Sequence, residues 1–245
     1  MKTVDEILTV LDGMAPLSTA EEWDNAGFQV GDLEANVKKA LVCLDVTEAA
    51  LEEAQKIGAE LIISHHPLLF TPLSDLPADH LIYKLAVAGI SNIAMHTNLD
   101  KAQGGVNDCL AAALDLTDLR EAYGLGRVGT LETALSPREF AVKVKTLLGT
   151  AVRLKEGSRA VKTVGLLGGA GGDVLEGDEV AAVDAFVTGE IKHHQWLAAP
   201  DVTVVDAGHY FTENVVVEPL CAALSAKLPD VEFIPFLATA PYETI

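Results

Sequence analysis

Two adjacent histidines, His65 and His66, follow a short apolar run and precede Pro67. Residues 61–63 are apolar and include two β-branched isoleucines, which is typical of a buried strand, and Pro67 has no N–H with which to continue a ladder. Ligands bind at the carboxyl ends of strands in α/β sheets, where a turn lets neighbouring side chains converge. The pair is therefore a candidate metal-binding pair. The alternative is that one histidine caps a helix or bonds in the core while the other faces solvent.

A histidine followed four residues later by a carboxylate occurs twice, as His96 with Asp100 and as His209 with Glu213. His209 and Glu213 lie where a helix is expected to begin, so their side chains should share one helix face and could hold the same ion. The alternative is a solvated helix start with an acid near its amino terminus.

Apart from His96, these residues together supply three imidazoles and two carboxylates from three expected strand ends. Such a mixed set is typical of zinc, iron, manganese or nickel sites. Five ligands are too many for an open single-metal site, and a carboxylate can bridge, so the set predicts two ions about 3.5–4 Å apart. The predicted ligands are His65, His66, Asp100, His209 and Glu213. For His96 the alternatives are a sixth ligand, a hydrogen-bond partner of a ligand, or a core histidine; we favour the second.

The elements that must position these residues repeat along the chain. First strands are expected from Ala40 and Thr163, and second strands from Leu61 and Ala185, which are separations of 21 and 22 residues. Each second strand is followed by a His-His pair, the later one being His193 and His194, and each third strand leads into a His-x-x-x-acid sequence. The sequence therefore predicts an α/β fold of two pseudo-duplicated lobes, with the metal site in the cleft between them. A Gly-Leu-Gly run at 124–126 places the expected boundary between lobes 1–124 and 125–245.

Composition narrows the class of partner. Lys plus Arg is 17 against 36 Asp plus Glu in 245 residues, a formal net charge of −19. An acidic field repels polyanions, so nucleic acid is not the expected partner, although a local basic patch in an assembly stays open. Three cysteines without a Cys-x-x-Cys spacing indicate neither a disulfide framework nor a thiolate zinc site. The amino-terminal pattern is that of an amphipathic helix and no apolar run reaches membrane-spanning length, so we expect a cytoplasmic protein without a membrane segment.

Three further stretches carry candidate functional residues. Glu190 and His194 follow the second strand of the second half and could transfer protons on a bound substrate. Residues 168–172 read Gly-Gly-Ala-Gly-Gly after a strand, and either contact a phosphate or form a close-packed turn, which we favour. Trp23-Asp24-Asn25 is either a turn anchored by its aromatic ring or part of the site.

Five motifs in order resemble one family. They are Trp23-Asp24-Asn25, Ser64-His65-His66-Pro67, His96-Thr97-Asn98-Leu99-Asp100, Thr188-Gly189-Glu190-Ile191-Lys192-His193-His194 and Gly208-His209-Tyr210-Phe211-Thr212-Glu213. Together they resemble the dinuclear metal-centre hexameric family, known as GTP cyclohydrolase 1 type 2 homologues and including YbgI.

The resemblance covers nearly the whole chain and implies a toroidal homohexamer of two-lobed α/β protomers without the inserted middle domain of longer members. It also implies that the five metal ligands carry over. Two functions follow as expectations. One is metal-dependent hydrolysis of a small phosphorylated or nucleotide-like substrate. The alternative is a non-catalytic hexameric metal-binding scaffold, a metal carrier or a regulatory interaction protein.

Overall fold

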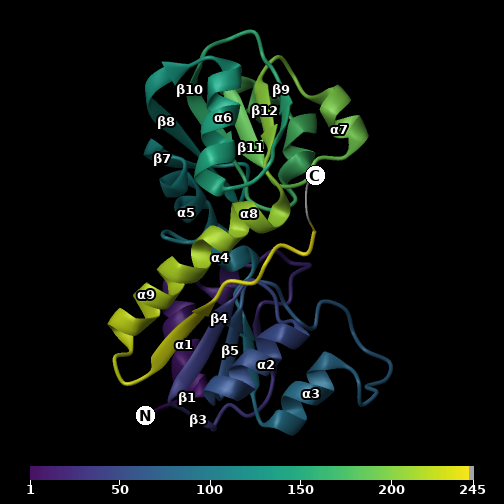
Figure 1. Ribbon diagram of the computed structural model, residues 1–245, viewed down its shortest axis with the longest axis vertical. Coiled ribbons are helices and arrows are strands. Elements are labelled where there is room, and N and C mark those ends of the chain that lie inside the picture. The colour runs from purple at the N-terminus through teal and green to yellow at the C-terminus, as the bar shows by residue number, and fades with distance from the viewer. Residues whose placement is uncertain (243–245) are drawn as a thin grey trace. The chain divides into compact units, whose positions relative to one another are not determined.

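The computed structural model describes residues 1–242, and the chain forms two compact α/β units (Figure 1). The first unit comprises Met1–Gln103 with Val217–Thr239, and the second comprises Gly104–Val216 with residues 240–242. This division differs from the boundary expected at 124. Strand β7 (Thr117–Ala122) pairs with β8 (Gly126–Leu135) in the second unit, whereas β13 (Glu232–Phe236) pairs with β4 (Lys39–Cys43) in the first.

The first unit is built on a five-stranded sheet in the order β13-β4-β5-β6-β2. Strands β13, β4, β5 (Leu61–Ser64) and β6 (Ser91–Ala94) run parallel, and β2 (Gly27–Val30) is an antiparallel edge. A short pair, β1 (Lys2–Thr3) with β3 (Asn36–Val37), stands beside it. The helical elements are α1 (Val4–Met14), η1 (Leu17–Thr19), α2 (Glu48–Ile57), α3 (Leu81–Ala88), α4 (Thr97–Lys101) and α9 (Val217–Lys227).

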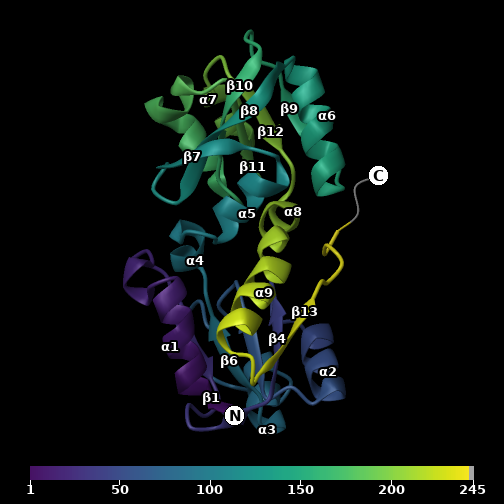
Figure 2. The same cartoon turned by 90° about the vertical axis from the view of Figure 1, so that its left-hand side faces the viewer.

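Local signals account for these elements. Every residue of β5 and β6 is buried, as expected for parallel strands with helices on both faces. Figures 1 and 2 show α1 on one side of this sheet and α2 on the other. Helix α2 begins after Thr47, whose hydroxyl accepts a hydrogen bond from the Ala50 N–H and so caps the helix. It ends at Gly58, whose φ of 70° is a left-handed conformation that glycine adopts without strain.

The second unit is built on a six-stranded sheet in the order β7-β8-β10-β11-β12-β9. Strands β10 (Val161–Leu166), β11 (Ala185–Thr188) and β12 (Thr203–Asp206) are parallel, while β7, β8 and β9 (Arg153–Lys155) run antiparallel to their neighbours. The helices are α5 (Val106–Ala113), α6 (Pro137–Leu148), α7 (His193–Ala198) and α8 (His209–Glu213). Short 3-10 segments are η2 (Gly171–Glu176), η3 (Asp178–Ala182) and η4 (Asn214–Val216).

Alternate residues of β11 face two separate cores. Val187 packs in a cluster with Phe140 of α6, whereas Phe186 packs in a cluster with Trp196 of α7. The period of two follows from strand geometry. Figure 2 accordingly shows α6 and α7 on opposite sides of this sheet.

The two units repeat one arrangement. Each has three neighbouring parallel strands, and the registers pair Ala40 with Leu61 in one unit and Val164 with Ala185 in the other, both separations of 21 residues. Each third strand is soon followed by a five-residue helix, α4 or α8. The predicted duplication is confirmed in this respect. The second His-His pair does not correspond to the first, because β11 ends at Thr188 and His193 already begins α7.

The helix expected to begin at His209 is short, because the helical segment is interrupted after Glu213. Helix α8 ends at Glu213, the 3-10 segment η4 follows, and α9 starts at Val217. Pro219, the third residue of α9, has no N–H for a helical hydrogen bond, which accounts for a break just upstream of it. Among residues 1–242, no helix combines the length and the apolar character needed to cross a membrane.

Candidate metal centre

Three chemically active side chains form a row beyond the ends of three parallel strands in the first unit. The register pairs Cys43 of β4 with Ser64 of β5, and Ser64 with Ala94 of β6. Counting two residues beyond each of these positions reaches Asp45, His66 and His96. Parallel strands end at the same edge of a sheet, so equal offsets bring these residues side by side.

His65, His66 and His96 form one cluster of imidazoles. The ring centroids lie 4.9 Å apart for His65 and His66, 5.2 Å for His65 and His96, and 5.6 Å for His66 and His96. One ligand atom from each ring lies within 4.8 Å of the other two, which is close enough for a shared ion. His96 therefore belongs to the cluster as closely as the two histidines predicted to be ligands.

Every ring of this cluster has its Nδ1 atom beside an oxygen. The contacts are His65 Nδ1 to the Met95 carbonyl at 2.8 Å, His66 Nδ1 to Asp45 Oδ1 at 2.7 Å, and His96 Nδ1 to Asp24 Oδ1 at 2.8 Å. A carbonyl or carboxylate oxygen accepts a hydrogen bond, so Nδ1 carries the proton in each ring. The lone pair on Nε2 is then the one that can bind a metal, which is the usual arrangement of ligand histidines.

Asp24 fixes the entry to α4 as well as the His96 ring. Its side chain accepts hydrogen bonds from the Thr97 N–H at 3.0 Å and from the Thr97 hydroxyl. Burial raises the pKa of Asp24, but the hydrogen bonds from Thr97 and His96 outweigh it and the pKa is lowered. Burial, together with neighbouring His65, lowers the pKa of His96 despite the Asp24 charge, which favours the neutral imidazole that a metal requires.

Asp100 stands beside this cluster. It is buried on α4, and its Oδ1 atom lies 3.7 Å from Nε2 of His65. A carboxylate near Nε2 supplies the oxygen donor that the predicted mixed set needs. The first unit alone thus holds three imidazoles and one carboxylate in a compact group.

The second unit holds the other predicted pair. His209 Nε2 lies 2.8 Å from Oε2 of the buried Glu213, one turn along α8 as predicted. Glu190 Oε1 lies 3.1 Å from Nδ1 of His209. Glu190 therefore orients His209 as Asp45 orients His66, with a carboxylate on Nδ1, and leaves Nε2 of His209 beside Glu213.

The glycine stretch at 168–172 is a close-packed turn against this pair. The N–H groups of Gly168, Gly169 and Gly171 donate to side-chain oxygens, namely Asn107 Oδ1 at 2.8 Å, the Thr212 hydroxyl at 3.0 Å and the Thr188 hydroxyl at 3.0 Å. These donors are thereby engaged within the protein, so the phosphate-contact alternative loses its basis.

Gly169 has a specific reason to be glycine. Its φ is +64°, and a Cβ atom there would lie 2.0 Å from Glu213 Oε1 and 3.0 Å from His209 Nε2. Only a residue without a side chain lets the backbone approach the pair this closely.

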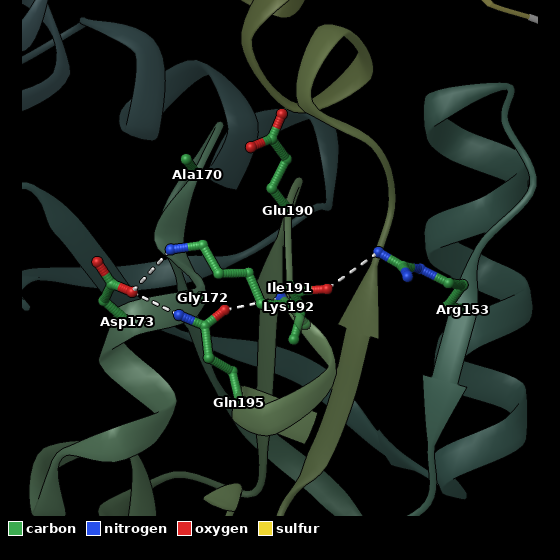
Figure 3. A pocket seen from close by; sticks show the side chains of 8 residues that line it. All are labelled: Arg153, Ala170, Gly172, Asp173, Glu190, Ile191, Lys192 and Gln195. Atoms are coloured by element: carbon green, nitrogen blue, oxygen red, sulfur yellow. Dashed lines mark hydrogen bonds and ion pairs between the residues drawn. The ribbon is translucent and has the colours of Figure 1, made fainter. Parts of the chain in front are cut away.

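Glu190 also lines a pocket of about 290 Å³ with Arg153, Lys192 and Gln195 (Figure 3). The Lys192 ammonium lies 4.0 Å from Asp173, and the Arg153 guanidinium donates to the Ile191 carbonyl at 3.4 Å. Arg153 and Glu190 line a second pocket that His209 also borders. Cationic and hydrogen-bonding groups therefore adjoin His209 in this unit.

His194 is not among the residues that line either of these pockets. Its side chain is 67% exposed on α7, and its Nε2 atom lies 3.4 Å from Glu176. Glu190 thus contacts His209, whereas the described partner of His194 is Glu176 on the surface.

Sequence reasoning did not single out Asp45. Its position two residues beyond a strand end, like those of His66 and His96, is recognised only when the register between the strands is known. For Asp24 the sequence leaves two alternatives, a packed turn or a place in the site, and the structure shows its carboxylate beside His96.

Two α/β units of repeated topology, with histidines and carboxylates beyond their parallel strands, define a class of bilobal α/β proteins. The chain belongs to the Duf34/NIF3 (NGG1p interacting factor 3) family, whose sequence profile matches residues 2–241. It is 31% identical over 248 residues to a protein of Clostridium perfringens named GTP cyclohydrolase 1 type 2 homolog, covering 94% of this chain and 95% of that protein.

Solved structures agree. The Staphylococcus aureus protein SA1388 superposes with a TM-score of 0.92 at 28% identity, covering 100% of this chain and 99% of that one. Protein ybgI superposes with a TM-score of 0.89 at 23% identity, covering 98% and 100%, which shows a common fold. The resemblance stated from the five motifs is confirmed.

Proposed function

We propose that this protein binds two divalent metal ions and hydrolyses a small phosphorylated or nucleotide-like substrate. The proposed metal ligands are His65, His66, Asp100, His209 and Glu213, and the candidate ions are zinc, iron, manganese and nickel. A relative that carries the name GTP cyclohydrolase 1 type 2 homolog is consistent with a nucleotide-like substrate.

The observation that carries the proposal is that four histidines share the same hydrogen-bonding arrangement at Nδ1. Four rings, those of His65, His66, His96 and His209, have Nδ1 beside a carbonyl or carboxylate oxygen. Histidines that merely fill a core have no reason to share one tautomer and one orientation, whereas metal ligands do. His96 is thereby a candidate sixth ligand.

Divalent ions at such a site supply Lewis acidity, which lowers the pKa of water and stabilises charge on phosphate oxygens. The protein's own groups would keep the imidazoles neutral and oriented. Glu190 holds the Nδ1 proton of His209 in this scheme, and His194 is the proposed proton carrier on the substrate.

Turnover should be assayed on a panel of nucleotides and sugar phosphates, with each of the four metals supplied separately. His66→Ala should abolish hydrolysis, and His194→Ala should lower kcat by about 100-fold, the lower end of the range for losing a general acid or base. His193→Ala is the matched control, because it removes the neighbouring exposed imidazole.

Lack of turnover throughout the panel, or full turnover in His66→Ala, would contradict the catalytic proposal. The non-catalytic metal-binding scaffold or carrier would then be the better account. Equal loss in His193→Ala and His194→Ala would remove His194 from the mechanism and leave the metal site in place.

A further inference from the structure

We propose that Trp23 and Phe70 form a stacking surface for a planar heteroaromatic ring, such as the base of a nucleotide. The proposal rests on the proposed function and narrows its substrate class to molecules that carry such a ring. It concerns the first unit alone, where both side chains border the imidazole cluster.

Both aromatic rings are unusually exposed for their size. Trp23 is 59% exposed and Phe70 is 51% exposed, in a chain whose aromatic content is only 5%. Large exposed apolar side chains that lie together generally mark a binding site rather than a solvated face. Indole and phenyl rings also present π-faces on which planar ligands stack.

The two rings and the His96 imidazole form a compact group. Ring centroids are separated by 6.0 Å for Trp23 and Phe70, 6.0 Å for Trp23 and His96, and 6.2 Å for Phe70 and His96. The interplanar angles are 57°, 77° and 82°, so the Trp23–Phe70 pair is tilted, the two pairs with His96 are edge to face, and none of the three is stacked face to face. Since Trp23 and Phe70 are also more than half exposed, part of their ring surface stays open to a ligand beside a proposed metal-binding histidine.

The backbone that carries the rings is tied in place. Asn25 donates its side-chain N–H to the Leu69 carbonyl, and the Leu69 N–H donates to Gln29 Oε1 at 3.0 Å. The Gln29 amide in turn donates to the Asn25 carbonyl at 2.6 Å. A stacking surface held this way binds a ring at little entropic cost. These contacts explain why the three residues occur together. Trp23 supplies the proposed stacking ring, Asp24 holds His96, and Asn25 holds the loop that carries Phe70.

The neighbourhood favours a small polar molecule over an apolar protein surface. The rings stand against His96, and His66 lies 5.6 Å from His96 by ring centroids, so an occupant must satisfy imidazoles as well as aromatic faces. A heteroaromatic ring with a phosphate-bearing tail does both, because its flat part stacks and its polar part reaches the proposed metal ligands.

The test uses the protein's own fluorescence. The chain has two tryptophans, so Trp196→Phe leaves Trp23 as the sole indole reporter. Guanosine 5′-monophosphate and ribose 5-phosphate are titrated into the zinc-loaded variant. The proposal predicts saturable quenching by the nucleotide, and a nucleotide Kd raised about 5- to 150-fold by Phe70→Ala, the span expected for losing one base–aromatic stack. Tyr83→Ala, which removes another exposed aromatic ring of the same unit, should leave Kd unchanged.

Equal quenching by ribose 5-phosphate, no quenching by either compound, or equal effects of Phe70→Ala and Tyr83→Ala would each overturn the proposal. A lower molar mass for Trp23→Ala would overturn it too, since the rings would then be covered by a second copy of the chain. Binding is measured without turnover and zinc content is recorded for each variant. If the protein holds zinc but the nucleotide does not quench its Trp23 fluorescence, only the stacking surface is refuted. If the protein holds no zinc, the metal site is refuted.

Discussion

The Nδ1 atom of His66 lies 2.7 Å from Oδ1 of Asp45, at the ends of two neighbouring parallel strands. Asp45 is 48% exposed at its side chain, and its described hydrogen bond is the one to His66. The carboxylate thus orients the imidazole of a proposed metal ligand. It offers a way to disturb metal binding without disturbing the core.

Replacing Asp45 by alanine should weaken metal binding by about 10- to 100-fold, the usual cost of removing a partner that orients a ligand. Asp45→Asn should be intermediate, because an amide oxygen still accepts the Nδ1 proton but carries no charge. Competition with a chelating indicator measures the affinity, and thermal unfolding of the metal-free protein checks that stability is unchanged.

Asp32→Ala is the matched control. Its Oδ1 atom accepts a hydrogen bond from the Glu34 N–H at 2.9 Å, and its described contacts do not include a histidine. Equal affinity in wild type and Asp45→Ala would mean that the contact has no part in metal binding.

Gly169→Ala should remove metal from the protein and lower its stability. The new Cβ would lie 2.0 Å from Glu213 Oε1, so the carboxylate has to move. Gly149→Ala is the matched control, because Gly149 has the same φ of +64° but no atom within 4 Å of the added Cβ. Both variants pay about 1–2 kcal/mol for a left-handed non-glycine residue.

The difference in metal content between these two glycine variants isolates the steric effect. If both keep the metal content of the wild type, the turn at 168–172 is not needed to position Glu213. Thermal unfolding should show the larger loss of stability in Gly169→Ala.

Metal occupancy should fall as the pH drops below about 6, because ligand histidines must be neutral and protons compete with the metal. The lowered pKa of Asp24 keeps its carboxylate charged as the solution becomes more acidic, so His96 keeps its acceptor through this range. The direction of the pH dependence is therefore set by imidazole protonation. Bound metal, and the stability that it confers, is present at neutral pH and lost on acidification. Elemental analysis after dialysis between about pH 7.5 and pH 4.5 measures the loss. Full occupancy at the acidic end would argue against histidine ligands.

The family resemblance predicts a closed homohexamer. Light scattering should then return six times the chain mass of 25.9 kDa. The mass should be independent of concentration in the micromolar range, because a closed ring leaves no open ends for further association. A monomeric mass under these conditions would refute the hexamer.

Much of the central architecture could be predicted because it is encoded locally. Apolar runs at 40–44, 61–63 and 185–187 specify buried strands, and Thr47 with Gly58 brackets a helix in the sequence itself. The spacing between the first and second expected strands is about twenty residues in each half, and this match predicted the duplication.

The features that could not be predicted depend on pairing between segments that are far apart in the sequence. Strand β13 contains Pro235 and joins β4 from the far end of the chain, where no local pattern indicates its partner. The same pairing moved residues 217–239 into the first unit. At the site, the side-chain types and spacing singled out His65, His66 and Glu213. The role of Asp45 required the register between strands, which the sequence does not state.

The most direct test of the account is the metal content of protein purified under mild conditions and analysed element by element. Two equivalents of divalent metal per 25.9 kDa chain are predicted, with most of both lost in Glu213→Ala. Glu218→Ala, which changes an exposed acid early in α9, should keep both. A single equivalent that survives Glu213→Ala would contradict the two-metal centre.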